Sequence, residues 1–352
     1  MSRDPRHDFP ELPAVETLRD APYDARGVTL DVLRLDRLHP LWGGNKVFKL
    51  LPNLHRAEAL GLRRVISFGG AYSNHLHALA AWGAEHGVQT VGIVRGEAPA
   101  RPGPTLRELH ERGMHIRHVS RAEYRRRHDP AWVEAVTREL MPALVIPEGG
   151  DNAEGFAGCR ELGRSIAALA GGWDVIALAC GTGTTLAGVV AGSGAYVLGV
   201  AALRDAAGIT ARAAAHLARP RVGPDLSGHP GDCPDESGPT GRCPDKSGPT
   251  GRCPDESGPT ARRFRVLERF AGRGFARIYS ELAAFMAQFT QRNGVPLDPV
   301  YTGKLFLGLH TLVGEGRFPP GTRVLALHTG GLQGARGASP GRMLPAAHAV
   351  PL

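Results

Sequence analysis

Short apolar runs alternate with helical segments along most of this chain, and this pattern limits the folds open to it. Val65–Phe68 and Val175–Ala179 are short and apolar, and each leads into a glycine-containing turn, as buried strands often do. Segments such as Ser73–His86 and Glu154–Leu169 have apolar residues at helical spacing. Strands that alternate with helices favour β-α-β units and parallel sheets. We therefore predict an α/β fold, with further elements at Val28–Asp36, Phe48–Leu60, Thr90–Val94, Thr105–Arg112, Ile116–Val119, Ala131–Leu140, Ala143–Pro147, Leu186–Ala191, Tyr196–Leu203, Ser280–Arg292, Lys304–Glu315 and Arg323–His328.

The composition is that of a globular protein of about two domains. The chain has 352 residues, of which 42% are hydrophobic and 22% charged, and a domain typically takes about 150 residues. No stretch of ~18 apolar residues predicts a membrane helix, and residues 1–16 lack the apolar core of a secretory signal. The net charge of +8 comes without nucleic-acid motifs or stacking aromatics. We expect a cytoplasmic protein with no membrane or nucleic-acid partner.

Residues 231–260 are three copies of a ten-residue unit rich in Gly, Pro, Ser and Asp. Such a segment buries too little apolar surface to offset the entropy lost on ordering. We predict that 222–262 is a low-complexity insertion within the domain around it. The alternative is a soft-metal site on Cys233, Cys243 and Cys253, but their wide spacing on a flexible chain argues against it, and we predict no metal site.

The clearest candidate site is the turn 181–185, which joins the strand Val175–Ala179 to the helix at Leu186. Its glycines let the backbone approach an anion, and its N–H groups and threonine hydroxyls can donate hydrogen bonds to that anion. No lysine follows the glycines, as a P-loop requires, and Leu186 stands where a dinucleotide fingerprint has its third glycine. The turn predicts a phosphate site; the alternative is a tight turn needed only for packing.

A lysine pair follows the turn Gly43-Gly44-Asn45. The chain has only four lysines, and two of them, Lys46 and Lys49, lie three residues apart on one face of the predicted helix. Neighbouring cations depress each other's pKa, and a lysine acts as nucleophile or base only without its proton. A solvated pair is the alternative, but a chain this poor in lysine that places two of its four within one turn is expected to need them there.

Polar side chains also meet a helix start after the strand Val65–Phe68. Ser73, Asn74 and His75 follow a pair of glycines. Ser73 alone would be an ordinary N-cap, whereas three successive polar side chains suit a carboxylate or phenolate oxygen at the positive end of a helix. A lysine able to condense with an aldehyde, a phosphate turn and this helix start together predict pyridoxal 5'-phosphate (PLP) as cofactor and a small amino acid as substrate.

Five segments resemble the D-cysteine desulfhydrase and 1-aminocyclopropane-1-carboxylate (ACC) deaminase family of PLP-dependent enzymes. They are GGNKVFKL, SFGGAYSNH, ACGTGTT, LDPVYTGK and LALHTGGLQG, between about residues 28 and 334. The resemblance implies a tryptophan synthase β-like fold of two α/β domains, three-layer αβα with parallel twisted sheets. The smaller domain would be 48–157 and the larger one 1–47 with 158–352, with the cofactor between them. A homodimer is expected by analogy with the family.

The resemblance also implies roles for single residues. Lys46, Ser73 and Tyr301 would be catalytic, with Lys46 bonding to the cofactor and later moving the Cα proton. Asn74 would bind the phenolic oxygen of the cofactor, and Thr302 would face its ring nitrogen. The substrate carboxylate would be held by Ser73, Asn74 and His75. The phosphate would be held by Lys49, Gly181, Thr182, Gly183, Thr184 and Thr185.

Thr302 also bears on the reaction. ACC deaminases have an acidic residue at this place, which keeps the ring nitrogen protonated, whereas a threonine favours a neutral nitrogen and a weaker electron sink. That suits loss of a good β-leaving group, so we predict β-elimination, with D-cysteine giving pyruvate, ammonia and sulfide. ACC deamination to α-ketobutyrate and ammonia, β-replacement, racemisation and a PLP-binding protein without turnover are the alternatives. His75 replaces an amide of the ACC deaminases, and Phe275 lacks the hydroxyl of a family tyrosine, so the substrate stays open.

Overall fold

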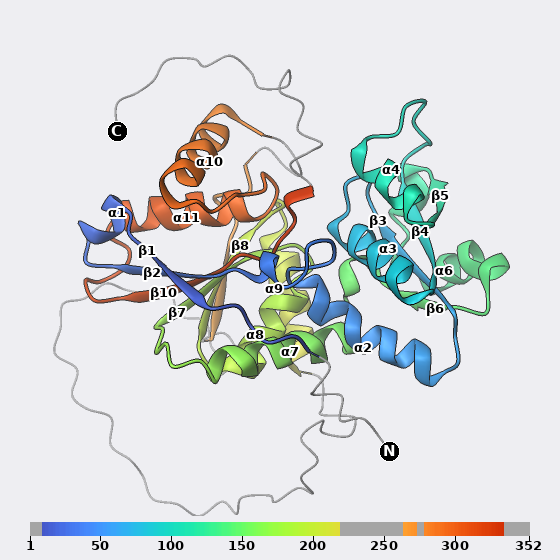
Figure 1. Cartoon of the computed structure of the whole chain (residues 1–352), viewed down its shortest axis with the longest axis horizontal. Helices are drawn as coiled ribbons and strands as arrows, with labels where there is room; N and C mark the ends of the chain where they lie inside the picture. Colours follow the sequence, from blue (N-terminus) through green and yellow to red (C-terminus); the bar gives the residue numbers. More distant parts are fainter. Residues whose placement is uncertain (1–8, 219–262, 273–277, 334–352) are drawn as a thin grey trace, which may run out of the picture.

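The structure is a computed structural model that describes residues 9–218, 263–272 and 278–333. It contains two sheets, one of six strands and one of four, which lie side by side in Figure 1. The predicted insertion 222–262, its repeat and Phe275 lie outside the described residues. Among the described residues, no helix is both long and apolar enough to cross a membrane.

The larger sheet has the strand order β1-β2-β10-β7-β8-β9. β1 runs antiparallel to β2, and every other neighbouring pair is parallel. Parallel neighbours require crossover connections, which the intervening helices supply. The strands are β1 (Val15–Leu18), β2 (Thr29–Leu33), β7 (Val175–Cys180), β8 (Tyr196–Ala201), β9 (Phe264–Leu267) and β10 (Arg323–Leu327).

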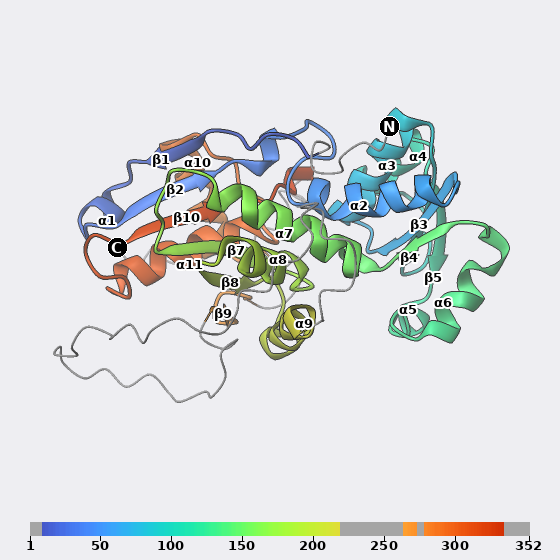
Figure 2. The same cartoon turned by 90° about the horizontal axis from the view of Figure 1, so that it is seen from below.

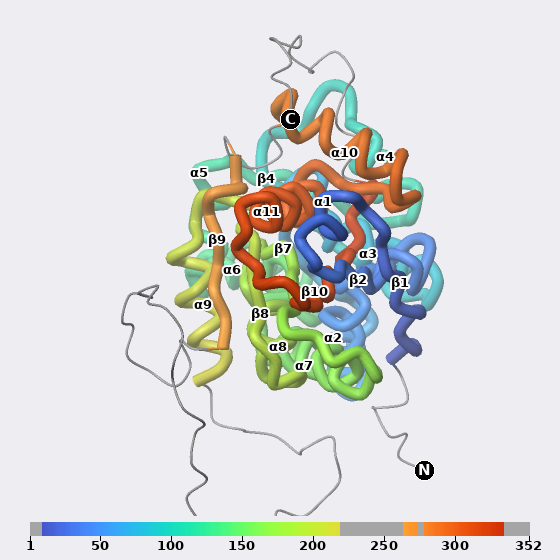
Figure 3. The backbone as a smooth tube through the Cα atoms, turned by 90° about the vertical axis from the view of Figure 1, so that its left-hand side faces the viewer, coloured from blue at the N-terminus to red at the C-terminus, as the bar shows by residue number. Residues whose placement is uncertain are grey.

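Helices cover both faces of this sheet because its strands are apolar on both sides. In β7, Ile176 and Leu178 pack with α7, α8 and α9, whereas Ala177 and Ala179 pack with α10 and α11 on the other face. Figures 1 and 3 show α11 and α7 on opposite sides of the strands. The helices of these layers are α1 (Ala21–Asp24), α7 (Ala153–Ala167), α8 (Thr184–Ser193), α9 (Ala206–Ala218), α10 (Ser280–Asn293) and α11 (Thr302–Gly314).

The smaller sheet is wholly parallel, in the order β5-β4-β3-β6. It is also covered on both faces: Val65 packs with α2 (Lys46–Ala59), α3 and α4, whereas its neighbour Ile66 packs with Tyr124 and Trp132 of α5 and α6. Its elements are β3 (Arg64–Gly69), α3 (Asn74–His86), β4 (Gln89–Arg95), α4 (Pro104–Glu111), β5 (His115–Val119), α5 (Arg121–Tyr124), α6 (Pro130–Thr137) and β6 (Leu144–Ile146).

Helix α2 (Lys46–Ala59) belongs to both halves of the molecule. Phe48 lies in the core of the larger sheet, and Leu50 and Leu54 lie in the core of the smaller one. A Cβ added to Gly158 of α7 would lie 1.7 Å from the carbonyl oxygen of Phe48, so α2 and α7 touch through their backbones. Figure 2 shows α2 running from the end of α7 along the smaller sheet. The first turn of α2 therefore lies where the two cores meet.

The predicted α/β class with parallel sheets is confirmed. All strands of the smaller sheet lie within 64–146, which agrees with the expected smaller domain, and the 48–157 boundary stays a proposal. β2 is shorter than predicted because Leu35–Arg37 forms a 3-10 turn. Five helices and strands were not predicted: β1, α1, α5 and β9 are four residues each, and the alanine-rich α9 has weak periodicity.

Candidate active site

Five segments that are far apart in the sequence meet at the carboxyl ends of the strands, where parallel sheets place their ligands. They are the start of α2 and the turns that follow β3, β6, β7 and β10. Lys49 of α2 donates to the carbonyl of Gly149 after β6 (2.9 Å), and Gln333 after β10 donates to Asn74 after β3 (2.5 Å). Asn45 joins α2 to β7 and β10 through Thr185 and Thr329.

Lys46 lies at the centre of this region, at the first position of α2. Its Nζ donates to the side-chain oxygen of Asn45 (2.7 Å), whose amide in turn donates to Thr185 Oγ1 (2.9 Å). Burial and the neighbouring charge of Lys49 lower the pKa of Lys46 to about 7, against weaker opposing effects of Cys159 and Asp298. The amine therefore loses its proton near neutral pH, as a nucleophile or base must.

Gly44 allows the chain to enter α2 at this point. Its φ is +80°, in the left-handed region that favours glycine. A Cβ at Gly44 would also lie 2.3 Å from the carbonyl oxygen of Thr329, in the turn just after β10. The glycine thus lets the loop pass directly against β10 and brings Lys46 to the strand ends.

Lys49 joins the predicted phosphate turn. Its buried Nζ lies 3.3 Å from Thr182 Oγ1, and Thr182 Oγ1 lies 2.9 Å from Thr184 Oγ1. Gly183, at φ +97°, makes the bend before α8, and the first turn of α8 contains Thr184 and Thr185. The structure therefore brings together Lys49 and the turn 181–185, as predicted, at the positive end of a helix.

Ser73 and Asn74 keep donors available at the start of α3. Ser73 Oγ accepts from the N–H of Leu76 (3.2 Å), which leaves its hydroxyl proton for a ligand. Asn74 Oδ1 accepts from Gln333, which leaves its Nδ2 group as a donor. A Cβ at Gly331 would lie 2.3 Å from Asn74 Nδ2, so a side chain there would take the space beside this amide.

His75 is buried, and its hydrogen bonds fix where its proton lies. Ser67 Oγ donates to the carbonyl of Ile146 (2.9 Å), so the 3.0 Å contact between His75 Nε2 and Ser67 Oγ needs a proton on Nε2. Burial, with the charges of Lys46 and Lys49, holds the pKa of His75 well below its ordinary value. Nδ1 is therefore an acceptor, and it is buried without a partner among the described residues. A neutral ring of this kind offers no proton to a carboxylate, which was its predicted role.

Tyr301 and Thr302 come from the start of α11. A Cβ at Gly181 would lie 3.4 Å from the Tyr301 ring, so this ring rests against the phosphate turn. Burial and the charges of Asp298 and Glu148 raise the pKa of Tyr301, so its hydroxyl stays protonated. Thr302 is fully buried, and its hydroxyl donates to Asp298 Oδ2 (2.7 Å) and accepts from Asp298 N (2.8 Å). The proton of Thr302 is thus used within the protein and does not face the site.

Five residues of the hydrogen-bond network at this site were not predicted. They are Asn45, Asp298 and Gln333, described above, and Asp151 and His216, since Asp151 Oδ1 accepts from Thr184 Oγ1 and His216 Nε2. Asn45 directly precedes Lys46, and Asp151 follows Glu148-Gly149-Gly150 at a strand end, so both had a local signal. Asp298 precedes the predicted Tyr301, and its carboxylate accepts four hydrogen bonds at the start of α11. His216 lies on the unpredicted α9 and had no signal. In the described part of the chain, no three His, Cys, Asp or Glu side chains are grouped as metal ligands.

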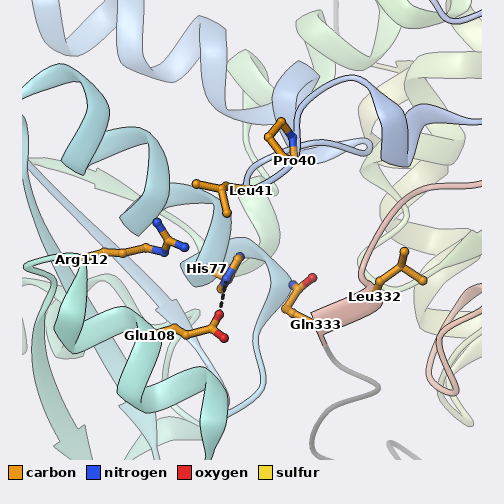
Figure 4. A pocket seen from close by; sticks show the side chains of 7 residues that line it. All are labelled: Pro40, Leu41, His77, Glu108, Arg112, Leu332 and Gln333. Atoms are coloured by element: carbon orange, nitrogen blue, oxygen red, sulfur yellow. Dashed lines mark hydrogen bonds and ion pairs between the residues drawn. The ribbon is translucent and has the colours of Figure 1, made fainter.

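A pocket of about 230 Å³ lies beside this region, between the loop before α2, helices α3 and α4, and the loop after β10. Figure 4 shows His77 and Glu108 paired on one wall (2.9 Å) and Gln333 on another. None of its lining residues is a predicted site residue, but Gln333 also bonds Asn74. The pocket therefore borders the candidate site at Asn74.

Comparisons with known proteins bear on the family and the fold of the chain. A sequence model of the family described as "Pyridoxal-phosphate dependent enzyme" matches residues 18–330. The chain is 27% identical over 348 residues to the "Bifunctional D-cysteine desulfhydrase/1-aminocyclopropane-1-carboxylate deaminase, mitochondrial" of Arabidopsis thaliana, covering 94% of this chain and 79% of that protein. It is 26% identical over 301 residues to the "D-cysteine desulfhydrase" of Yersinia pestis, covering 82% of each. A crystal structure of an "ACC deaminase homologue" superposes with a TM-score of 0.69 at 24% identity, covering 95% of this chain and 96% of that one, which is a likeness of fold.

Proposed function

Because this chain belongs to the pyridoxal-phosphate dependent enzyme family, we propose that it catalyses β-elimination and deamination of a small amino acid, with D-cysteine giving pyruvate, ammonia and sulfide. The observation that carries this proposal is Lys46, whose amine has a pKa lowered to about 7 beside the turn that Lys49 joins. The family match confirms the prediction of a PLP-dependent enzyme.

The residues present fit this cofactor. Lys46 offers a reactive amine to its aldehyde, and Lys49 with the turn 181–185 offers a cation and donors to its phosphate. Asn74 offers a free amide N–H to its phenolic oxygen. The orphaned Nδ1 of His75 is a buried acceptor that a ligand can satisfy, and leaving it unsatisfied costs roughly 1–3 kcal/mol.

Each side chain then has a task defined by its hydrogen bonds. When bound, the cofactor supplies an electron sink that makes the Cα proton of an amino acid acidic. Lys46 takes that proton at Nζ, which is neutral near pH 7. Ser73 donates its spare proton to the substrate carboxylate. Tyr301 keeps its hydroxyl proton and serves as an acid toward the leaving group.

The choice of substrate rests on Thr302, because the relatives carry both names. Both relatives named above are called D-cysteine desulfhydrase and one also ACC deaminase, whereas a 28% identical relative from Pyrococcus abyssi is called "Putative 1-aminocyclopropane-1-carboxylate deaminase" alone. Position 302 holds threonine and so has no carboxylate of its own to offer the ring nitrogen, which favours a substrate with a good leaving group. ACC deamination to α-ketobutyrate and ammonia is the second candidate.

Two measurements test the proposal. Lys46→Ala should abolish both the visible absorbance of lysine-bound PLP and turnover; retained absorbance would move the covalent bond to Lys49 or Lys304. The wild type should release keto acid and sulfide from D-cysteine, in a panel with L-cysteine, β-chloro-D-alanine and ACC. Turnover of ACC and of no other substrate in the panel would make ACC deamination the favoured function in place of D-cysteine desulfhydration. Full PLP binding with no turnover of any of these would indicate a non-catalytic PLP-binding protein.

The oligomeric state and the cellular localisation of the protein are part of the same proposal. We expect a homodimer in the cytoplasm, with the cofactor held between a smaller domain at 48–157 and a larger domain from the flanking segments. Light scattering on the purified holoenzyme measures the mass, and a monomer would contradict the dimer. Deletion of 222–262 should leave cofactor binding intact, because every residue assigned above to cofactor or substrate lies outside that segment.

A further inference from the structure

Asp151 places a carboxylate directly at the turn that we assign to phosphate. Its Oδ1 accepts from Thr184 Oγ1 (2.6 Å) and from His216 Nε2 (2.7 Å). A carboxylate has no proton to give, so Thr184 and His216 both donate to it. One of the hydroxyls at the turn is therefore already bonded to an anion that the protein itself supplies.

The other side-chain hydrogen bonds of the turn are donated in sequence toward Asp151. The proton of Thr184 goes to Asp151, so in the 2.9 Å contact between Thr182 and Thr184 the donor is Thr182. Lys49 donates to Thr182 in turn (3.3 Å). The bonds thus run from Lys49 through Thr182 and Thr184 to Asp151: the hydroxyl proton of Thr182 goes to Thr184, and that of Thr184 goes to the carboxylate.

Asp151 is charged at neutral pH. Burial alone would raise its pKa, but the hydrogen bonds from His216 and Thr184 and the charge of Lys49 hold the pKa below its ordinary value. His216 is buried and stacks on Phe156 at 5.3 Å, and its Nδ1 has no partner among the described residues. Among the described residues, the His216 ring therefore forms its hydrogen bond through Nε2 to Asp151.

A contact from α9 also reaches the backbone of the turn and does not involve its hydroxyls. Arg212 of α9 donates to the carbonyl of Thr182 (2.9 Å) and pairs with Asp205 (2.9 Å). Asp205 is thus linked to the turn only through Arg212, and its carboxylate accepts no hydrogen bond from the hydroxyls of the turn. It offers a matched control for the removal of a negative charge.

We propose that Asp151 competes with the cofactor phosphate at the turn 181–185 and so limits its affinity, with His216 reducing the competition by donating to Asp151. This inference rests on the proposed placement of the phosphate. A phosphate at the turn meets the like charge of Asp151 and finds the proton of Thr184 already committed. Asp151→Asn keeps an oxygen acceptor for Thr184 and removes the charge.

The test measures anion binding rather than turnover. PLP binding to the cofactor-free protein is titrated by visible absorbance, with inorganic phosphate as competitor and pyridoxal, which lacks the phosphate, as control ligand. Asp151→Asn should bind PLP and inorganic phosphate about three- to tenfold more tightly and leave pyridoxal unchanged. Asp151→Ser, an uncharged acceptor, should act in the same direction, and Asp205→Asn should change neither ligand. Thermal unfolding checks that each variant is folded.

His216→Phe supplies the second half of the test. This variant keeps an aromatic ring against Phe156 but gives Asp151 no proton, so it should weaken phosphate binding at least threefold. In the Asp151→Asn background the same change should have no effect. Equal or weaker phosphate binding by both Asp151 variants would overturn the inference alone, because the wild type would still bind PLP. A wild type that binds no PLP would refute the proposed function and this inference with it.

Discussion

The Nζ of Lys49 lies 3.3 Å from the Oγ1 of Thr182, although 133 residues separate them in the chain. The contact joins the first turn of α2, which packs on both sheets, to the turn after β7. It places the buried cation of Lys49 at the start of α8, where the helix dipole already favours anions. The charge of Lys49 and the helix dipole therefore both attract the same phosphate group.

Replacing Lys49 by methionine should therefore weaken PLP binding. A hydrogen bond to a charged group contributes about 1.5–3 kcal/mol, and about 1.4 kcal/mol is tenfold in affinity, so we expect a loss of about 10- to 100-fold. Titration of the cofactor-free protein by visible absorbance measures it. Pyridoxal should lose less affinity than PLP, because it feels only the higher pKa of Lys46 in the variant and has no phosphate; an equal loss for both ligands would show that Lys49 does not act on the phosphate.

Lys49 should also control the protonation of Lys46. The pKa of Lys46 is lowered to about 7 by burial and by Lys49, compared with about 10.4 for a lysine in water. Modification of Lys46 by an amine-directed reagent, followed by peptide mass spectrometry from pH 6 to 9, should reach half its maximal rate near pH 7. In Lys49→Met the half-point should move to higher pH, because one of the two lowering causes is gone. A wild-type rate that still rises steeply at pH 9 would contradict the lowered pKa.

Gly44→Ala should cost more stability than Gly61→Ala, although both residues have positive φ. Alanine in the left-handed region costs about 1–2 kcal/mol. A Cβ at Gly61 would meet no atom within 4 Å, whereas one at Gly44 would lie 2.3 Å from the Thr329 carbonyl oxygen. Urea unfolding measures both. Gly44→Ala should also reduce formation of lysine-bound PLP, because the clash moves the start of α2; equal unfolding free energies for the two variants would show that the loop yields freely.

What the sequence could predict here depended on how local the signal was. Lys46, Ser73 and the turn 181–185 each lie at a helix start within three residues of a glycine, so residue type and local position together indicated a site. His216 lies 65 residues from Asp151 and meets it only because α9 folds against α8. Neither a hydrophobic periodicity nor a local motif in the sequence predicts a contact of this kind.

Hydrogen-bond direction was likewise beyond the sequence. Thr302 was expected to face the ring nitrogen on the basis of a motif, and the structure shows that its proton goes to Asp298. His75 was expected to grip a carboxylate, whereas Ser67 and Ile146 fix its proton on the side away from its free nitrogen. Residue type states which atoms can donate; only the packed neighbours decide where each proton goes.

The buried state of His75 should make the fold sensitive to acid. Its pKa in the folded protein is held well below the ordinary value by burial and by Lys46 and Lys49, whereas the unfolded chain has a histidine pKa of about 6.5. Below pH 6.5 the unfolded state binds a proton that the folded state refuses. The free energy of unfolding therefore falls as the pH drops below 6.5, by up to about 1.4 kcal/mol per pH unit for this one group.

His75→Gln, whose amide can still donate to Ser67, should flatten this decline when urea unfolding is compared at pH 7.5, 6.5 and 5.5. His110→Gln, at an exposed position, controls for the loss of a surface imidazole; an unchanged pH slope in His75→Gln would mean that the buried ring takes up its proton in the folded state after all.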